Sequence, residues 1–161
     1  MVVGSFTVEQ VSAFPPARLW KGGILDAHNL IPKVLPEVIA SITIIEGYGG
    51  VGSIREMKFT EAIKDITQLK DCINVVDDEK HVFKYTVIEG GFIGLKLKSY
   101  SFETCLEPAG DNGSISKLTV EYDTMDGQSL TDADVNMIKG GIIGMAKAIE
   151  GYLQANPDAY A

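Results

Sequence analysis

Residues 131–157 read TDADVNMIKGGIIGMAKAIEGYLQANP, and this stretch has the pattern of one long amphipathic helix. Its apolar residues recur at every third or fourth position, at Val135, Ile138, Ile142, Met145, Ile149 and Leu153. Thr131 and Asp134 have the spacing of a capping box, and Asn156-Pro157 ends the pattern. At about 1.5 Å per residue, a helix from Thr131 to Gln154 would be roughly 36 Å long, about the width of a small domain.

The chain between Ile39 and Tyr122 predicts six strands that follow one another. Runs of β-branched and aromatic residues alternate there with turn-forming clusters at residues 46–52, 77–79, 89–91 and 108–113. Such short connections join antiparallel strands, because a parallel pair needs a crossover of a dozen residues or more. We therefore expect an antiparallel sheet that wraps around the long helix.

The N-terminal part predicts one more strand and two short helices. The strand covers residues 2–11. Pro15-Pro16 begins the first helix and Gly22-Gly23 ends it. Asp26 is the expected N-cap of the second helix, which Pro36 ends because proline lacks a backbone donor.

Residues two apart alternate between an apolar and a polar face of the predicted sheet. The apolar face carries Phe83, Tyr85, Val87, Tyr100, Phe102, Leu118, Val120 and Tyr122. The polar face carries Lys84, Thr86, Lys117, Thr119 and Glu121.

Three glycines, Gly140, Gly141 and Gly144, stand inside the predicted helix. Each costs on the order of 1 kcal/mol of helix stability relative to alanine, so a reason for their presence is needed. They either let the helix approach the sheet closely or, with the aromatic residues of the sheet, line a cavity. The residue pattern leaves both interpretations open.

Composition predicts one soluble domain over residues 1–161. The 14 basic and 22 acidic residues give a net charge of −8, which argues against DNA, RNA and anionic membranes as partners. No apolar run is long enough to span a bilayer, and residues 1–11 show no export signal, so we expect a cytoplasmic protein. Cys72 and Cys105 have no metal-binding or disulfide spacing, and we expect reduced thiols in a monomer.

The glycine motif Gly47-x-Gly49-x-x-Gly52 has the letters of a dinucleotide-binding fingerprint. That fingerprint needs a helix directly after it, whereas Ser53–Thr60 has a strand pattern, so we interpret the motif as a glycine-rich hairpin. His28 and His81 are the only histidines and lack further ligands at metal spacing. We expect neither a metal nor a cofactor.

Several segments together resemble the plant pathogenesis-related class 10 family, to which the major birch pollen allergen belongs. They are the glycine-rich loop EGYGGVGS at residues 46–53, IEGG at 88–91, and KAIEGYL at 147–153 followed by NPDAY at 156–160. The resemblance covers essentially the full length. It implies an α+β, helix-grip fold: seven antiparallel strands around the C-terminal helix, two short helices beneath it and a large internal cavity.

The resemblance also implies which residues line that cavity. By position they are Ile24, Ile31, Ile39, Arg55, Met57, Phe59, Phe83, Tyr85, Tyr100, Phe102, Ser116, Leu118, Met137, Ile138, Gly141, Ile142 and Met145. Gly47, Gly49, Gly50 and Gly52 form the glycine-rich loop. Arg55 is the expected polar anchor and would favour ligands that carry a carboxylate or phenolate.

Two enzymatic alternatives come from the same resemblance. Some family members are described as ribonucleases; Glu150 and Tyr152 match two of their proposed residues, but Lys98 replaces the third. Another branch closes a ring in alkaloid synthesis with a lysine and a tyrosine; Lys117 matches the lysine, but Phe92 replaces the tyrosine.

We therefore expect a ligand-binding protein rather than an enzyme. Its implied role is in plant defence, and its implied ligands are amphipathic small molecules: cytokinins, flavonoids, steroids or fatty acids. Such ligands would be buried in the cavity, with tyrosine hydroxyls and Arg55 setting their orientation.

Overall fold

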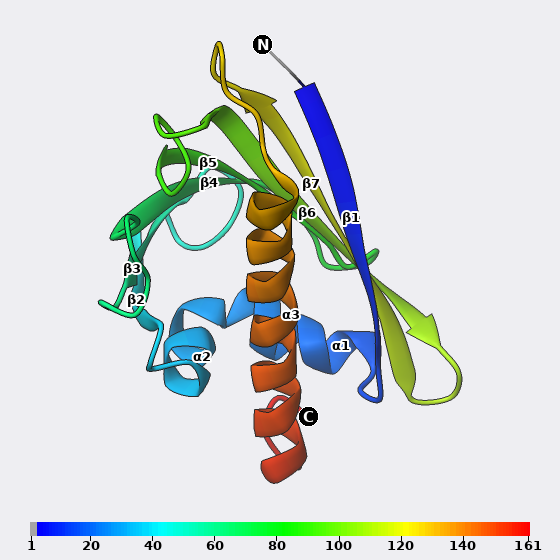
Figure 1. Cartoon of the computed structure of the whole chain (residues 1–161). Coiled ribbons are helices and arrows are strands. Elements are labelled where there is room, and N and C mark those ends of the chain that lie inside the picture. Colours follow the sequence, from blue (N-terminus) through cyan, green and yellow to red (C-terminus); the bar gives the residue numbers. More distant parts are fainter. Residues whose placement is uncertain (1–2) are drawn as a thin grey trace.

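The computed structural model describes residues 3–161, so Val2, which the first predicted strand includes, lies outside the described residues. A single curved sheet wraps around one long helix. The short helical segments lie at one end of the sheet (Figure 1). The strands are β1 (Val3–Ser12), β2 (Ile39–Glu46), β3 (Ile54–Phe59), β4 (Gln68–Asp77), β5 (Val82–Gly90), β6 (Leu97–Ala109) and β7 (Gly113–Thr124). The helices are α1 (Pro16–Leu19), the π-helix η1 (Trp20–Leu25), α2 (Ala27–Val34) and α3 (Asp132–Ala155).

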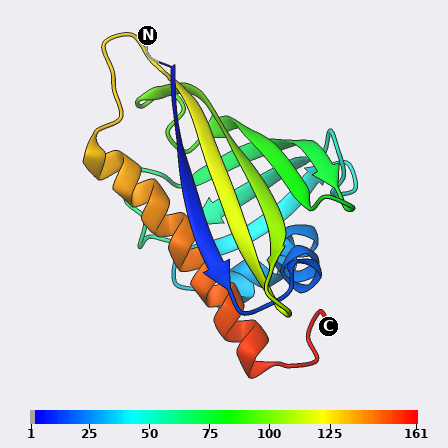
Figure 2. The same cartoon turned by 90° about the vertical axis from the view of Figure 1, so that its right-hand side faces the viewer.

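All seven strands belong to one antiparallel sheet with the order β1-β7-β6-β5-β4-β3-β2. Strands β2 to β7 lie side by side in chain order, as the short connections predict, and β1 adds to the far edge beside β7. The antiparallel sheet around one helix is therefore confirmed. Figure 2 shows α3 running along the sheet with β1 next to it.

The long helix begins and ends where the sequence predicts. Thr131 is the N-cap and forms a capping box with Asp134, and Asn156 is the C-cap. Along the predicted apolar stripe only Ile149 and Leu153 are buried; the residues nearer the N-terminus of α3 are half-buried. The C-terminal half of the helix therefore supplies most of its packing.

The prediction that Gly22-Gly23 ends the first helix is wrong. The chain continues through both glycines as the π-helix η1. A Cβ on Gly22 would lie 3.0 Å from the Tyr160 ring, and one on Gly23 would lie 3.3 Å from the Ile149 side chain. The glycines therefore allow η1 to pack closely against α3 and the segment after it, and tertiary contacts stabilise the helical turn that the glycines disfavour locally.

The predicted capping role of Asp26 needs a similar correction. Asp26 occupies the N-cap position of α2, but its side chain makes no capping hydrogen bond. The carboxylate instead accepts hydrogen bonds from the Tyr160 hydroxyl and the Asn29 amide. The helix ends at Val34, before Pro36 as predicted.

The buried core is divided into three clusters. One joins α2, β2 and the C-terminal end of α3 through residues such as Leu30, Ile42 and Leu153. A second surrounds Trp20, and a third surrounds Tyr100. Val135, Ile138 and Ile142 of α3 belong to none of these clusters of described residues. The buried packing of α3 therefore comes from its C-terminal half, where Ile149 and Leu153 join the first cluster.

Candidate ligand-binding site

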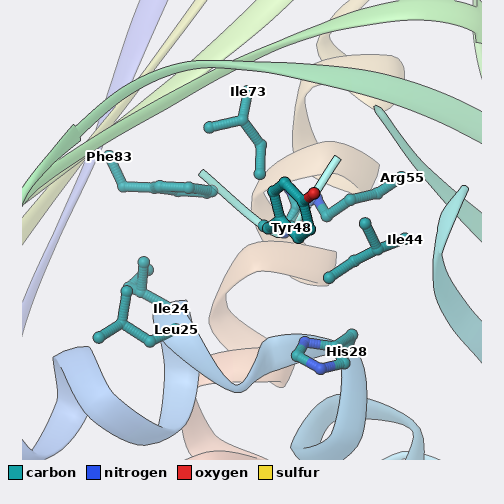
Figure 3. A pocket seen from close by; sticks show the side chains of 9 residues that line it. Ile24, Leu25, His28, Ile44, Tyr48, Arg55, Ile73 and Phe83 are labelled. Carbon is teal, nitrogen blue, oxygen red and sulfur yellow. The ribbon is translucent and has the colours of Figure 1, made fainter. Parts of the chain in front are cut away.

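A pocket of about 150 Å³ lies between the short helices and the concave face of the sheet (Figure 3). The segment η1–α2 forms one wall, strands β2 to β5 form the other, and the loop after β2 lies at the rim. The lining residues are Ile24, Leu25, His28, Ile44, Tyr48, Gly49, Arg55, Ile73 and Phe83.

The polar centre of this pocket is an ion pair between neighbouring strands. Arg55 on β3 lies directly opposite Asp71 on β4. The Arg55 Nε donates to Asp71 Oδ1 at 2.9 Å, and Nη2 donates to Oδ2 at 3.2 Å. Only 11% of the Arg55 side chain and 4% of the Asp71 side chain are exposed. The charge of Arg55 is therefore neutralised inside the protein.

Burial and ion pairing shift the pKa of Asp71 in opposite directions. Loss of hydration raises the pKa of its carboxyl group, and the nearby Arg55 guanidinium opposes that shift. The two parallel hydrogen bonds are the geometry of a carboxylate bound to a guanidinium, so the ion pair makes the removal of either partner costly.

Two aromatic rings flank the Arg55 guanidinium. Its central carbon lies 5.2 Å from the ring centre of Phe83 and 5.0 Å from that of Tyr85. Loss of hydration is the main cause that raises the pKa of Tyr85, so its hydroxyl stays protonated. Tyr85 packs against Arg55 but is not itself one of the residues that line the pocket.

An uninterrupted run of aromatic contacts continues from the pocket across β5 and β6. Ring centres are 6.5 Å apart for Trp20 and Phe83, 5.7 Å for Phe83 and Tyr85, and 5.1 Å for Tyr85 and Phe102. Tyr100 follows, 5.7 Å from Phe102. Trp20 is tied in place because its indole Nε1 donates to Asp78 at 2.8 Å. The concave face therefore offers a pre-formed apolar surface beyond the pocket.

Ser53 fixes the base of the glycine-rich loop. Its hydroxyl accepts a hydrogen bond of 2.9 Å from the Gly49 backbone, and its carbonyl accepts one from Ile73 on β4. Gly47, Gly49 and Gly52 have positive φ angles, which explains why glycine is needed there. Tyr48 is fully exposed at the tip of the loop, yet it lines the pocket.

The structure brings three of the predicted lining residues together in this pocket: Ile24, Arg55 and Phe83. Others lie in the core cluster at the C-terminal end of α3, namely Ile31, Ile39, Met57, Phe59 and Met145. Tyr85, Tyr100 and Phe102 form the aromatic run. Ser116, Leu118, Ile138 and Ile142 are half-buried, whereas Met137 and Gly141 are exposed.

Several residues at the site were not predicted from the sequence. Leu25, His28, Ile44, Tyr48 and Ile73 line the pocket, and Asp71 neutralises Arg55. Tyr48 stands within the glycine motif, so that motif was the available signal. For Asp71 the signal is the register of β3 against β4, which residue patterns do not reveal.

The residues named for the ribonuclease alternative do not converge. Glu150 and Tyr152 are two positions apart on α3, so they point about 200° away from each other around the helix. The Tyr152 hydroxyl accepts a hydrogen bond of 3.1 Å from Lys33, whose ammonium also lies 4.9 Å from the Tyr152 ring centre. Lys98 is an exposed residue of β6.

The residues of the lysine-based alternative are also apart from the pocket. Lys117 has 46% of its side chain exposed and lies 3.8 Å from Glu107 as an ion pair. Its neighbours Ser116 and Leu118 point to the opposite side of β7. Phe92 contacts Tyr100 at the other end of the aromatic run.

A second hollow, an open groove of about 660 Å³, lies between the start of α1, the turn before β5 and the end of β6. None of the predicted site residues lines it. Among residues 3–161 there is no cluster of three or more histidine, cysteine or acidic side chains suited to a metal ion. In the same range, no helix has the length and apolar character needed to cross a membrane.

Comparison with known proteins places this geometry in a family. The sequence model of the pathogenesis-related protein Bet v 1 family matches residues 1–156. Class-10 pathogenesis-related protein 1 of Medicago truncatula is 39% identical over 98% of this chain and 99% of its own length. The crystal structure of Ara h 8.0201 is 35% identical with a TM-score of 0.85, covering 96% of this chain and 100% of the other.

The fold is also similar to the solved structure of an enzyme. The X-ray structure of norcoclaurine synthase from Thalictrum flavum is 25% identical, has a TM-score of 0.80 and covers 95% of this chain and 87% of the other. The full-length match to the family model and the 39% identity to a class 10 protein confirm the resemblance found in the sequence. The chain belongs to the Bet v 1 family of pathogenesis-related proteins.

Proposed function

We propose that this protein binds neutral, amphipathic small molecules, with one ring of the ligand held in the pocket beside Arg55. Cytokinins, flavonoids and other secondary metabolites are the classes that fit, and the proposed setting is plant defence inside the cell. The observation that carries the proposal is that Arg55, the charged residue of a mostly apolar pocket lining, is buried and neutralised by Asp71, with the Phe83 and Tyr85 rings against its guanidinium.

The volume of the pocket sets how much of a ligand it can hold. A cavity of about 150 Å³ lined by apolar residues accommodates benzene. The pocket beside Arg55 has this volume, so it holds one ring and not a whole two- or three-ring molecule. The rest of the ligand lies outside the pocket, against the aromatic run or at the rim.

The Arg55–Asp71 pair selects for neutral ligands. A ligand carboxylate at Arg55 would compete with Asp71 and would place a second negative charge beside its buried carboxylate. A ligand hydroxyl carries no net charge, and its oxygen can accept a hydrogen bond from Arg55, which lines the pocket and uses only Nε and Nη2 to bind Asp71. The expected preference of Arg55 for carboxylates is therefore replaced by a proposed preference for neutral polar groups.

Micromolar affinity is the expected range. Ligands of drug-like size gain about 0.3 kcal/mol per non-hydrogen atom, so a molecule of about 25 non-hydrogen atoms gains about 7.5 kcal/mol. This corresponds to a dissociation constant of about 3 μM.

Calorimetric titration with a cytokinin, a flavanone and a fatty acid tests the proposal, with Trp20 fluorescence as a second signal because Trp20 contacts Phe83 in the pocket wall. Ile24→Phe, which fills the pocket, should weaken cytokinin or flavanone binding at least tenfold. Ile88→Phe, on the exposed side of β5, is the control and should leave binding unchanged. Absence of saturable binding for every class, or equal binding by Ile24→Phe, would contradict the proposal.

A further inference from the structure

We propose that Tyr48 is a specificity-determining residue that covers the part of a ligand protruding from the pocket and so selects planar ligands with two rings. The inference rests on the proposed function, because it concerns the same pocket. It begins from two properties that rarely occur together: the Tyr48 side chain is fully exposed, and it lines the pocket that contains Arg55.

No packing contact within residues 3–161 of the folded protein explains a tyrosine at this position. A tyrosine normally buries much of its ring, and its large apolar area makes it an effective contact for a second ring. Tyr48 buries none of that area in the protein itself. The area is therefore available to a partner that the folded chain does not contain.

The glycine-rich loop that carries Tyr48 is anchored at its base, and its tip lies in open space. Ser53 is buried and bonds to the loop at both Gly49 and Gly50, while the Gly52 backbone donates to Ile73 of β4 at 2.8 Å. A Cβ built on Gly50 or on Gly52 meets no atom within 4 Å, so open space surrounds the tip. The Tyr48 ring can therefore change orientation while its backbone stays anchored at the rim.

The opposite rim supplies a matching surface. Leu25 of η1 is 47% exposed although it lines the pocket, and His28 follows it on α2 (Figure 3). Because the pocket has room for one ring only, we expect a second ring to protrude beside Tyr48 and Leu25, the lining residues that are most exposed. A flat ring can contact both side chains there, whereas a flexible alkyl chain loses more conformational freedom for the same contact.

The experiment compares a two-ring and a one-ring ligand on the same variants. Naringenin is the two-ring probe and 4-ethylphenol is the one-ring probe, with affinities measured by calorimetry. Tyr48→Ala should weaken naringenin binding about three- to tenfold, the range of one aromatic contact, and should change 4-ethylphenol binding less than twofold. Tyr48→Phe should retain naringenin binding, because the ring makes the contact.

Val51→Ala is the matched control: it removes an exposed apolar side chain of the same loop that does not line the pocket. It should leave both affinities unchanged. In the wild-type complex, nuclear Overhauser contacts between the Tyr48 ring and naringenin give a readout that does not depend on affinity.

Unchanged naringenin binding by Tyr48→Ala, or an equal loss for both probes, would overturn this inference while leaving the proposed function intact. Failure of the wild-type protein to bind either probe would overturn both. Thermal unfolding of each variant checks the fold, and the exposure of Tyr48 predicts no change in melting temperature.

Discussion

The Tyr160 hydroxyl donates a hydrogen bond to the carboxylate of Asp26, and so joins the segment after α3 to the start of α2. Burial and the negative charge of Asp26 together raise the pKa of Tyr160 to about 12, which keeps this donor protonated. The Tyr160 ring also packs against Gly22. This contact holds η1, the wall of the pocket that carries Ile24 and Leu25.

Arg18 makes a further attachment of this segment. Its guanidinium donates to the backbone carbonyls of Leu153, Asn156 and Ala159, each at 2.9 Å. Arg18→Ala should lower the free energy of unfolding by about 1–3 kcal/mol, because three carbonyls lose a charged donor. Urea denaturation measures the change. Arg18→Lys should recover only part of the loss, since one ammonium cannot reproduce the planar fork, and full recovery would contradict this account.

Removing Asp71 should leave a buried, unpaired charge on Arg55. Asp71→Ala is expected to lower the free energy of unfolding by about 3–5 kcal/mol. The double variant Arg55→Met/Asp71→Leu should be much more stable than Asp71→Ala, because it buries no charge. A double-mutant cycle by urea denaturation compares this double variant with Arg55→Met and Asp71→Leu alone, and additive losses would show that the pair is not coupled.

The Arg55–Asp71 ion pair also predicts that ligand preference changes when the charge of Asp71 is removed. Asp71→Asn keeps the shape of the side chain but leaves the charge of Arg55 without its counter-charge. We expect this variant to gain affinity for an aromatic carboxylate such as benzoate relative to phenol. Calorimetry on the wild type and the variant measures the ratio, and an unchanged ratio would contradict the proposed selection for neutral ligands.

Asp134 should contribute stability that acid removes. The hydrogen bond from Lys96 is the main cause that holds the pKa of Asp134 below its usual value, and the Thr131 backbone N–H adds to it. Because the pKa is lowered in the folded state, the stabilisation is complete above the ordinary value of about 3.9 and is lost as pH falls through the lowered value.

Asp134→Asn should therefore lower stability at pH 7 and show a smaller further loss between pH 5 and 3 than the wild type. Urea denaturation at several pH values tests this, with Asp132→Asn as the control for a charge change in the same helical turn. Parallel pH profiles for Asp134→Asn and the wild type would contradict the assignment.

Two glycines of α3 should be replaceable with a gain in stability. Gly140 and Gly144 are exposed, and a Cβ on either meets no atom within 4 Å. Gly140→Ala and Gly144→Ala should each raise the free energy of unfolding by about 0.5–1 kcal/mol, because alanine favours the helix. Thermal and urea unfolding measure the gain in stability. A loss of stability would contradict the open space found around these two glycines.

In the glycine-rich loop, the effect of substitution should depend on position. Gly47 has φ of +84°, and a Cβ there would collide with Ser53, whereas Gly50 has open space and no positive φ. Gly47→Ala should lower the free energy of unfolding by more than about 1 kcal/mol, and Gly50→Ala should have little effect. Equal effects of the two substitutions on the urea midpoint would contradict this explanation.

The order and type of the main elements could be predicted from residue patterns. The Thr131–Asp134 capping box and the Asn156 stop describe α3 correctly, and the short turns specify antiparallel neighbours. These features depend on residues close together in the chain, where spacing and backbone preference act directly. Where distant contacts outweigh local preference, prediction failed: η1 passes through Gly22-Gly23 because Tyr160 and Ile149 pack against it.

Which residues form the pocket depended on contacts between residues far apart in the chain, and local sequence patterns do not show such contacts. That Arg55 would be a polar residue at the site followed from resemblance, but its neutralisation by Asp71 arises only when β3 and β4 pair in one register. Tyr48 and His28 line the same pocket because a loop and a helix from different parts of the chain fold to the same place. Local periodicity therefore specified the sheet and the helix, whereas the charge, volume and rim of the pocket came from how those elements pack together.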